Sequence, residues 1–324
     1  MRKFFVASDI HSFYSEFREA LKKAGYNPKN KDHILILNGD LWDRGSESLK
    51  LFNFVKRLPK SRCILIKGNH EGLLIDLLEK DFPDPYDFSN GTVRTCFHFA
   101  KKVYEQNPEL ADIDEYYFDS LHSLYVFEGY ENDSKNKWIQ IRDYIKNSEF
   151  YKFLIDKRWK DWYELNDKFI ITHSFIPLEN LDGLPAHYVN HRSFKYKPDW
   201  RTSATERELE ESKWGCPWRL YRDGYFENEE KNGKILVCGH WHVSDFYHNL
   251  ANDYNSSYDT KIFKLKGIIA IDCGLVRNIF DFDEFYHPQN ILVINENNEL
   301  FDQDGNRIND VEIKPVYNTE LLKD

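Results

Sequence analysis

The sequence predicts an α/β fold, and two patterns carry that prediction. Six short runs of aliphatic and aromatic residues end abruptly in polar residues, as buried parallel strands do. Apolar residues at helical spacing lie between the first three runs, so the chain opens with a β-α-β-α-β order. The six runs are FFVAS before Asp9, HILILN before Gly39, RCILIK before Gly68, KFIIT before His173, KILVC before Gly239 and GIIAI before Asp272.

The elements after the first strand follow in order. Apolar residues between 13 and 24 predict a helix that stops at Gly25, and those between 49 and 55 predict a second helix. Residues 71–79 (EGLLIDLLE) predict a third helix, directly after the third strand. A seventh apolar run, at 291–295, is followed by no candidate site residue.

We expect residues 1–324 to form a single domain. From 80 to 167 the pattern changes to long, aromatic and charged helical stretches with no clear strand, which indicates a helical, aromatic-rich insertion within that domain. Packing is the commoner role of such aromatic residues, although the insertion could also form a lid over a site. Residues 174–233 form another long connection, with a predicted helix at 205–213.

Composition narrows the class of protein. The formal net charge of -10 argues against a protein that coats nucleic acid, because that function needs a dense basic face. Five cysteines, with no CxxC pair, favour a reducing compartment over a disulfide framework. No apolar run approaches the roughly 20 residues that span a bilayer. We therefore expect a cytoplasmic protein that binds neither membrane nor nucleic acid and has no obligate partner.

Five short motifs carry the candidate chemistry, and each follows an apolar run. They are D9-I-H11, G39-D-L-W-D-R-G45, G68-N-H-E71, T172-H173 and C238-G-H-W-H242. Because the carboxyl ends of parallel strands face a common crevice, residues distant in sequence should converge there. A single motif of this kind is common by chance, and an Asp or Asn after a strand is usually a turn residue. Five motifs in order at five strand ends favour a shared site.

The motif residues offer oxygen and imidazole ligands of the kind that bind divalent transition ions. The candidate ligands are Asp9, His11, Asp40, Asn69, His173, His240 and His242. Seven ligands are too many for one ion. Two ions that share one carboxylate, about 3.5 to 4 Å apart, satisfy the count and are suited to phosphoryl chemistry.

These motifs resemble those of the calcineurin-like metallophosphoesterase superfamily. GDLWDRG and GNHE are similar to the phosphoprotein phosphatase branch, which includes bacterial and phage serine/threonine phosphatases and diadenosine tetraphosphatases. The resemblance implies a four-layer α/β/β/α sandwich with two mixed sheets and the metals at one edge between them. It also implies a hydrolase that acts on phosphoric esters.

The resemblance further assigns ligands to two ions bridged by Asp40. Asp9, His11 and Asp40 would hold the first ion, and Asp40, Asn69, His173 and His240 the second. The superfamily uses both histidines of a GHxH block, whereas phosphoprotein phosphatases usually keep only the first. We assign His242 to the first ion on the superfamily pattern. Manganese is our first choice of metal, with iron, zinc, nickel and cobalt as alternatives.

A water that bridges two cations becomes hydroxide near neutral pH, and we expect this hydroxide to attack phosphorus in line. The planar fork of Arg44 suits bidentate contact with the phosphoryl oxygens, and Asn69 is a second candidate phosphate contact. By resemblance, His70 protonates the leaving alkoxide. Asp43 is its expected partner, because a carboxylate bonded to one ring nitrogen fixes the tautomer and favours the protonated imidazole.

The resemblance also implies a second phosphate-binding arginine between the fourth and fifth motifs. Arg192, Arg219 and Arg222 are the candidates, and we favour Arg219 in GCPWRL by position. Two departures from the family pattern favour a bacterial or phage-like member. The fourth motif reads THSF where many phosphoprotein phosphatases have two glycines after the histidine, and DCGL at 272–275 lacks the aromatic loop of eukaryotic members.

Three functions stay open from the sequence. The leading hypothesis is hydrolysis of phosphomonoesters, in the manner of a serine/threonine protein phosphatase, on a phosphorylated protein or a small phosphoester. The alternative is a nucleotide phosphohydrolase acting on a dinucleoside polyphosphate or cyclic nucleotide, because the aromatic insertion could stack a base. The third is a non-catalytic binding scaffold, against which the intact ligand set argues.

Overall fold

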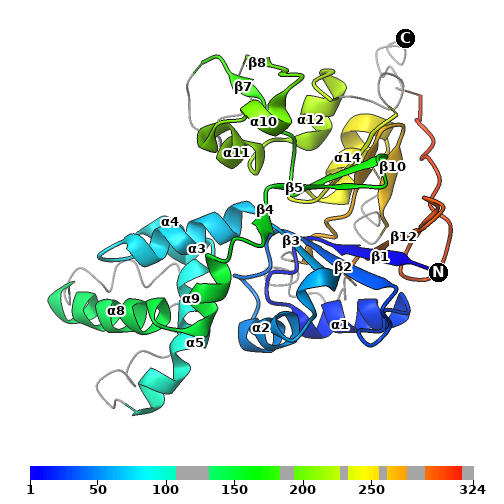
Figure 1. Cartoon of the computed structure of the whole chain (residues 1–324). Coiled ribbons are helices and arrows are strands. Elements are labelled where there is room, and N and C mark those ends of the chain that lie inside the picture. The colour runs from blue at the N-terminus through cyan, green and yellow to red at the C-terminus, as the bar shows by residue number, and fades with distance from the viewer. Residues whose placement is uncertain (107–130, 183–192, 227–232, 255–260, 276–288, 316–324) are drawn as a thin grey trace, which may run out of the picture.

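The computed structural model describes residues 1–106, 131–182, 193–226, 233–254, 261–275 and 289–315, and two mixed sheets form its centre (Figure 1). The first sheet consists of β1 (Lys3–Ala7), β2 (His33–Asn38), β3 (Cys63–Ile66), β4 (Trp159–Lys160), β12 (Leu292–Asn295) and β13 (Leu300–Phe301), in the order β13-β12-β1-β2-β3-β4. Strands β1 to β4 run parallel, and β12 and β13 pair antiparallel.

The second sheet has the order β10-β11-β9-β6-β5. Its strands are β5 (Trp162–Leu165), β6 (Phe169–Thr172), β9 (Ile235–Cys238), β10 (Phe263–Leu265) and β11 (Ile268–Ala270). The three inner strands run parallel, while β5 and β10 pair antiparallel at the edges. A separate pair joins β7 (Glu179–Asn180) to β8 (Phe194–Lys195). The predicted α/β class with two mixed sheets is confirmed.

Alternation of side chains along the strands produces the layers. Phe4 and Val6 of β1 lie in an apolar cluster between the sheets together with Ile171 of β6. The neighbouring Phe5 points to the opposite face and packs under the helices of the first sheet. Ile170 does the same on the outer face of the second sheet. Because successive strand residues face opposite sides, each sheet has one face on the other sheet and one on helices.

Helices cover both outer faces. Those over the first sheet are α1 (Tyr14–Lys23), α2 (Ser48–Lys56), α3 (Asn69–Glu79), α4 (Pro85–Ser89), α5 (Thr92–Gln106), α8 (Glu131–Lys146) and α9 (Glu149–Leu154), with the 3-10 turn η1 (Lys60–Arg62). Those on the side of the second sheet are α10 (Trp200–Ser203), α11 (Glu206–Ser212), α12 (Pro217–Arg222) and α14 (Val243–Ala251). No helix within the described ranges is long and apolar enough to cross a membrane.

The predicted strands and helices agree with the structure except in one segment. The expectation that residues 80–167 contain no clear strand is wrong, because β4 and β5 lie there and only Asp161 separates them. β4 extends the first sheet and β5 the second, so this short stretch links the two sheets. Its sequence, WKDWYEL, is short and mixes charged with aromatic residues, which hides the strand pattern.

The described helices of 80–167 add to the core beneath the second motif. Trp42 is fully buried, and its ring meets Phe150 of α9 edge-on at 5.0 Å between ring centroids. Phe99 of α5 and Phe52 of α2 complete this aromatic cluster. Aromatic rings in edge-to-face contact add to the burial of apolar area. The segment is thus packed directly against the residues that precede Asp43.

Candidate metal centre

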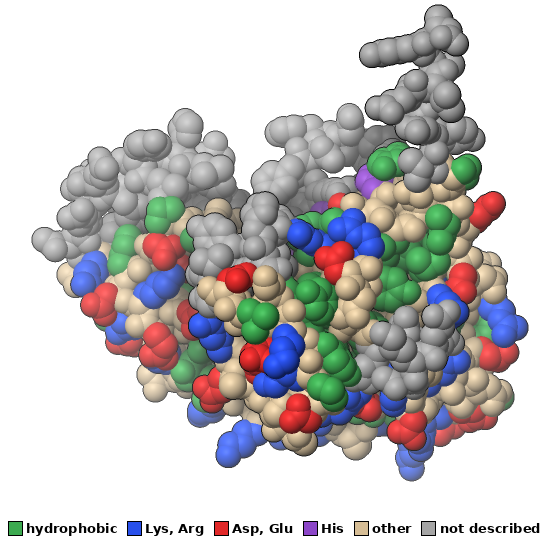
Figure 2. Space-filling view, turned by 90° about the horizontal axis from the view of Figure 1, so that it is seen from above, with side chains coloured by type: hydrophobic (Ala, Val, Ile, Leu, Met, Phe, Trp, Pro, Cys, Tyr) green, Lys and Arg blue, Asp and Glu red, His purple; other side chains and the backbone are tan. Residues whose placement is uncertain are grey.

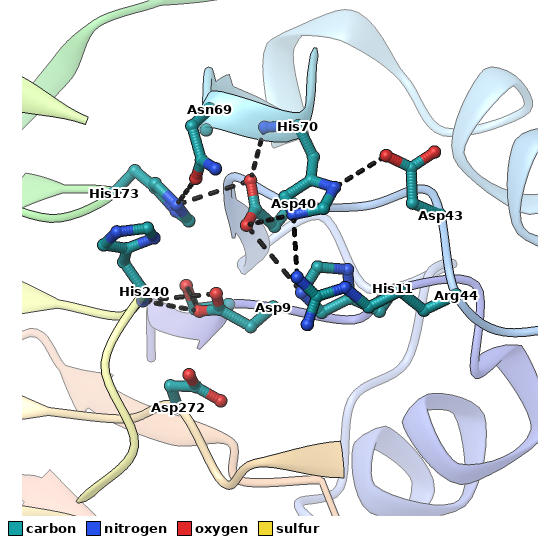
Figure 3. A network of polar contacts seen from close by, with 12 residues as sticks. Asp9, His11, Asp40, Asp43, Arg44, Asn69, His70, His173, His240 and Asp272 are labelled. Atoms are coloured by element: carbon teal, nitrogen blue, oxygen red, sulfur yellow. Dashed lines mark hydrogen bonds and ion pairs between the residues drawn. The ribbon is translucent and has the colours of Figure 1, made fainter. Parts of the chain in front are cut away.

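The predicted motif residues converge at one place between the sheets (Figure 3). They are Asp9 and His11 after β1, Asp40 after β2, Asn69 and His70 in the first turn of α3, His173 after β6 and His240 after β9. All of these strands end at the same side, as sequence reasoning predicts. Figure 2 shows only small patches of histidine side chain on this face of the molecule, and His11 and His173 are buried.

Asp40 lies at the middle of the cluster and faces a ligand atom on each side. Its Oδ1 lies 3.3 Å from His173 Nε2, and its Oδ2 lies 3.7 Å from His11 Nε2. Asn69 Oδ1 lies 3.0 Å from the same nitrogen of His173. Asp40 belongs to two groups whose ligand atoms lie within 4.8 Å of one another, one with His173 and His240 and the other with His11 and His70. A carboxylate placed between two groups of donors is suited to bridge two cations.

Hydrogen bonds on the far side of two imidazole rings aim the opposite nitrogen at this centre. Nδ1 of His11 lies 3.0 Å from the carbonyl oxygen of Trp42, and Nδ1 of His173 lies 3.0 Å from that of Asn38. A carbonyl oxygen only accepts, so each Nδ1 carries a proton and Nε2 is the ring nitrogen left to face the cluster. The neutral Nε2 is the form that binds a metal ion. The donor set therefore fits divalent cations.

The electrostatics of the cluster also suit a cation. Burial, with the negative charge of Asp272 nearby, raises the pKa of Asp9 well above its usual range. Burial alone would raise the pKa of Asp40, but the adjacent His173 holds it well below that range. Burial opposes protonation of His173 too, yet Asp40 raises its pKa to about 10. Burial and His173 lower the pKa of His240 to about 3, so this imidazole is neutral.

Several motif residues have a left-handed backbone, which is costly for residues with a side chain. The φ angles are 54° at Asp9, 46° at His11, 53° at Asp40, 72° at Asp43, 62° at Arg44 and 65° at His240. Such conformations cost of order 1–3 kcal/mol each and persist where the surrounding structure holds them. Their concentration in these motifs makes the cluster a candidate functional site.

Glu71 holds the turns that carry Asp40. Its buried carboxylate accepts hydrogen bonds from the backbone N–H groups of Asp40 at 3.0 Å, Leu41 at 2.9 Å and Gly68 at 2.7 Å. The last of these closes the N-terminus of α3, because Glu71 stands at the third helical position. One side chain thus ties the end of β2 to the start of α3.

Gly68 leaves no room for a side chain beside Asp40. In Gly68→Ala the new Cβ would lie 2.1 Å from Asp40 Oδ1 and 2.6 Å from its backbone nitrogen, so the carboxylate must move. We expect this variant to be destabilised by about 1–3 kcal/mol and to bind manganese more weakly. Gly72→Ala is the control, because its Cβ would meet nothing closer than Glu210 at 3.5 Å. Urea unfolding and metal titration compare them, and equal behaviour of the two variants would contradict this prediction.

The third motif places an imidazole next to Asp40, and the second motif places an arginine there. His70 Nδ1 lies 2.6 Å from Asp43 Oδ2, which fixes the proton on Nδ1 and turns Nε2 toward the cluster. That Nε2 lies 3.9 Å from Asp40 Oδ2 and 3.3 Å from Arg44 Nη2. Figure 3 shows Arg44 and His70 side by side on one flank of Asp40. An imidazole and a guanidinium are thus aimed at the same point.

The structure places His242 at the cavity but Arg219 away from it. His242 lines the central cavity with its Nε2 4.0 Å from Asp272, and like Asp9 it belongs to neither group of converging ligand atoms. Arg219 lies on α12 with its Nε 3.8 Å from Asp223 and does not line the cavity. Arg192 falls outside the described residues, so the second phosphate-binding arginine stays a prediction.

This cavity, of about 110 Å³, opens among the motif side chains. Asn90, Trp214 and Asp272 line it together with the predicted residues, and sequence reasoning missed all three. Asp272 could have been found, because it directly follows the apolar run GIIAI, as the other site residues follow theirs. Asn90 and Trp214 follow helices α4 and α11, where no sequence pattern points to a site.

The geometry defines a candidate dinuclear metal site on an α/β/β/α scaffold. The family model of calcineurin-like phosphoesterases matches residues 2–270, and the chain belongs to this family. Members of the family use a dinuclear divalent metal centre. The resemblance drawn from the motifs is confirmed.

Among curated relatives, the symmetrical bis(5'-nucleosyl)-tetraphosphatase of Buchnera aphidicola subsp. Schizaphis graminum is 45% identical over 71 residues, 22% of this chain and 25% of that protein. The asymmetrical bis(5'-nucleosyl)-tetraphosphatase PrpE of Bacillus subtilis is 35% identical over 158 residues, 43% of this chain and 63% of that protein. This chain therefore spans about a quarter of the length of the first relative. A cold-active protein tyrosine phosphatase structure aligns with a TM-score of 0.47 at 14% identity, covering 95% of this chain and 78% of that one.

Proposed function

We propose that the chain is a dinuclear, metal-dependent phosphatase that hydrolyses phosphomonoesters. The observation that carries this proposal is the position of Asp40 between two groups of ligand atoms, with His70 and Arg44 on one flank. Phosphoester hydrolysis needs cations to neutralise the phosphoryl oxygens and a donor for the leaving alkoxide. The residues that would bind the cations and supply the proton lie within one buried cluster, which supports the proposal.

Two divalent ions would share Asp40. Asp9 and His11 would complete the first site, joined by His242 if its ring turns from Asp272, and Asn69, His173 and His240 would complete the second. Of these residues, His11, His173 and His240 share the two groups of converging ligand atoms with Asp40. When bound, these ions supply an activated water and neutralise phosphoryl charge. Manganese is the metal we propose, because a mixed oxygen and imidazole set accepts it.

The chain's own residues divide the remaining work. Arg44 would hold two phosphoryl oxygens, since its Nη2 already lies beside His70 Nε2 where a leaving group would sit. His70, with a proton on each ring nitrogen, would give its Nε2 proton to the leaving oxygen, after Arg44 has turned from this nitrogen to the phosphoryl group. Asp43 keeps that imidazole in one tautomer and orientation through the 2.6 Å contact with Nδ1. Asn69 would contribute its side chain to the same phosphoryl group.

The small size of the cavity favours a substrate that places only its phosphoryl group inside the cavity. Its volume of about 110 Å³ is well below the ~300–1,000 Å³ of pockets that enclose a whole drug-sized ligand. The rest of the substrate would lie outside the described cavity walls. A phosphorylated serine or threonine of a protein, or a small phosphoester, meets this condition.

A second candidate is hydrolysis of dinucleoside polyphosphates. The relatives from Buchnera aphidicola and Bacillus subtilis are named for that activity. Trp214 also lines the cavity, with its ring 6.0 Å from that of His240. An indole at the mouth of a phosphate site offers a surface on which a base could stack.

A substrate panel separates these functions. The purified chain with manganese is incubated with an aryl phosphate, a phosphoserine peptide and a dinucleoside tetraphosphate, and products are followed by phosphate release and chromatography. We expect orthophosphate from the first two, and none from an Asp40→Asn variant. Turnover of the dinucleotide alone would favour the second candidate. Inactivity on every substrate with two ions bound would leave the binding scaffold as the function.

A cytoplasmic location is proposed as well, supported by five free, buried cysteines.

A further inference from the structure

Helix α5 reaches the back of the pair formed by Asp43 and His70. Thr95, in its first turns, is 1% exposed. Its hydroxyl donates to Asp43 Oδ1 at 2.7 Å and accepts from the backbone N–H of the same residue at 2.9 Å. A single hydroxyl therefore contacts both the side chain and the backbone of Asp43.

These two contacts fix the orientation of the Asp43 carboxylate. Oδ1 is taken by Thr95, so Oδ2 is the oxygen that faces His70 Nδ1, at 2.6 Å. The backbone of Asp43 has a φ of 72°, a conformation that needs outside support in a non-glycine residue. The hydrogen bond from its N–H to Thr95 provides such support. Without the Thr95 hydroxyl, Oδ1 would lose its hydrogen bond and the contact of Oδ2 with His70 would have to orient the carboxylate.

The same helix also holds the next residue of the motif. Arg94 Nη1 donates to the carbonyl oxygen of Arg44 at 3.0 Å. Gly91, directly before α5, approaches so closely that a Cβ there would lie 2.6 Å from the Arg44 nitrogen. The start of α5 therefore contacts two consecutive motif residues. These are Asp43, which would orient the proton donor, and Arg44, which would bind phosphate.

We propose that Thr95 is a positioning residue for proton donation, the outer member of a chain Thr95–Asp43–His70. This inference rests on the proposed role of His70 as the donor to the leaving group. Thr95 touches neither substrate nor ions, and it acts by holding Asp43 so that His70 Nε2 points at the leaving oxygen. The segment between 80 and 167 thereby contributes to the chemistry as well as to the core.

A hydroxyl on a helix can also bond the carbonyl of the preceding turn, which would be a purely local role. Here the Gly91 carbonyl oxygen lies 3.5 Å from Thr95 Oγ1, against 2.7 Å for the Asp43 carboxylate. The shorter, charge-assisted bond is the stronger of the two. The Thr95 hydroxyl accordingly donates its hydrogen bond to Asp43.

The test exploits the leaving group. An alkoxide must be protonated as it departs, whereas a nitrophenolate is stable without a proton, so only alkyl esters depend on the donor. Thr95→Val keeps the shape and removes the hydroxyl, and we expect kcat on an alkyl phosphate to fall roughly 10- to 100-fold with KM unchanged, the range for loss of an outer hydrogen-bond partner. The kcat on nitrophenyl phosphate should change little. Thr95→Ser should restore most of the alkyl-ester rate.

Thr92→Val is the matched control, because it makes the same change in the same helix at a buried hydroxyl with no hydrogen-bond partner among the described residues. It should leave the ratio of the two rates unchanged. Thermal unfolding and metal content verify that each variant is folded and loaded. Thr95→Ala, which removes the hydroxyl without a branched side chain, repeats the measurement if the valine variant proves unstable.

His70→Asn separates failure of this inference from failure of the proposed function. If His70→Asn lowers the alkyl-ester rate selectively and Thr95→Val does not, the role of Thr95 is overturned while that of His70 stands. If His70→Asn slows both esters alike, the proposed donor itself is wrong. A Thr95→Val variant that slows both esters equally, or that adds to the loss in the His70→Asn background, would also overturn the inference.

Discussion

Asp40→Asn is expected to lose most of its bound metal and nearly all phosphatase activity. Asp40 offers one oxygen toward His173 at 3.3 Å and the other toward His11 at 3.7 Å, so both proposed ions depend on it. An amide presents one neutral oxygen and an N–H₂ group that repels a cation. The fall in kcat/KM should exceed the about 10- to 100-fold that loss of an outer partner causes. Metal analysis and phosphate release measure both effects.

Asp143→Asn makes the same chemical change at an exposed position of α8 and is the control. It should keep two ions and full activity. A second consequence concerns His173, whose pKa Asp40 raises against the effect of burial. Removing the carboxylate removes the largest influence that raises this pKa, so the pKa of His173 should be lower in metal-free Asp40→Asn than in the metal-free wild type. Retention of both ions by Asp40→Asn would refute Asp40 as the bridge.

Residues at the ends of apolar strands were predictable, and the reason is geometric. A buried parallel strand has a recognisable composition, and its last residue fixes the position of the next residues in the chain. Asp9, Asp40 and His173 could thus be placed together without knowledge of the fold. The length and antiparallel partners of the edge strands were not visible, because β5 and β10 are short and carry charged residues.

Residues that reach the site from helices or loops could not be placed from the sequence. Thr95 and Asn90 lie far from the second motif along the chain, and their position depends on how α4 and α5 pack on the first sheet. Arg219 is the opposite case. Its place between the fourth and fifth motifs suggested a role, and on α12 its Nε lies 3.8 Å from Asp223, so that role stays a prediction. Order along the chain predicts strand ends well and helix faces poorly.

Removal of the ions is expected to abolish activity and to lower the thermal midpoint. Asp9, Asp40 and Asp272 are 3%, 2% and 4% exposed, so three carboxylates lie close together away from water. Burial and Asp272 raise the pKa of Asp9, which means that its negative charge is costly in the metal-free protein. A cation removes that cost, and one site at an ion concentration of 100 Kd stabilises the native state by about 2.7 kcal/mol.

Thermal unfolding in EDTA and in increasing manganese should therefore give a midpoint that rises with the ion concentration. The rise should be smaller at pH 5 than at pH 7, because protons compete with the ions for the carboxyl of Asp9 and for the imidazoles. Asp40→Asn should lose the rise, whereas Gly72→Ala should keep it, since that residue lies outside the cavity lining. A midpoint that is the same in EDTA and in manganese, while activity depends on manganese, would mean that the ions bind too weakly to relieve the buried carboxylates. Protonation, and not metal binding, would then have to relieve the repulsion among Asp9, Asp40 and Asp272. In that case activity should rise only at manganese concentrations far above those that saturate a buried dinuclear site.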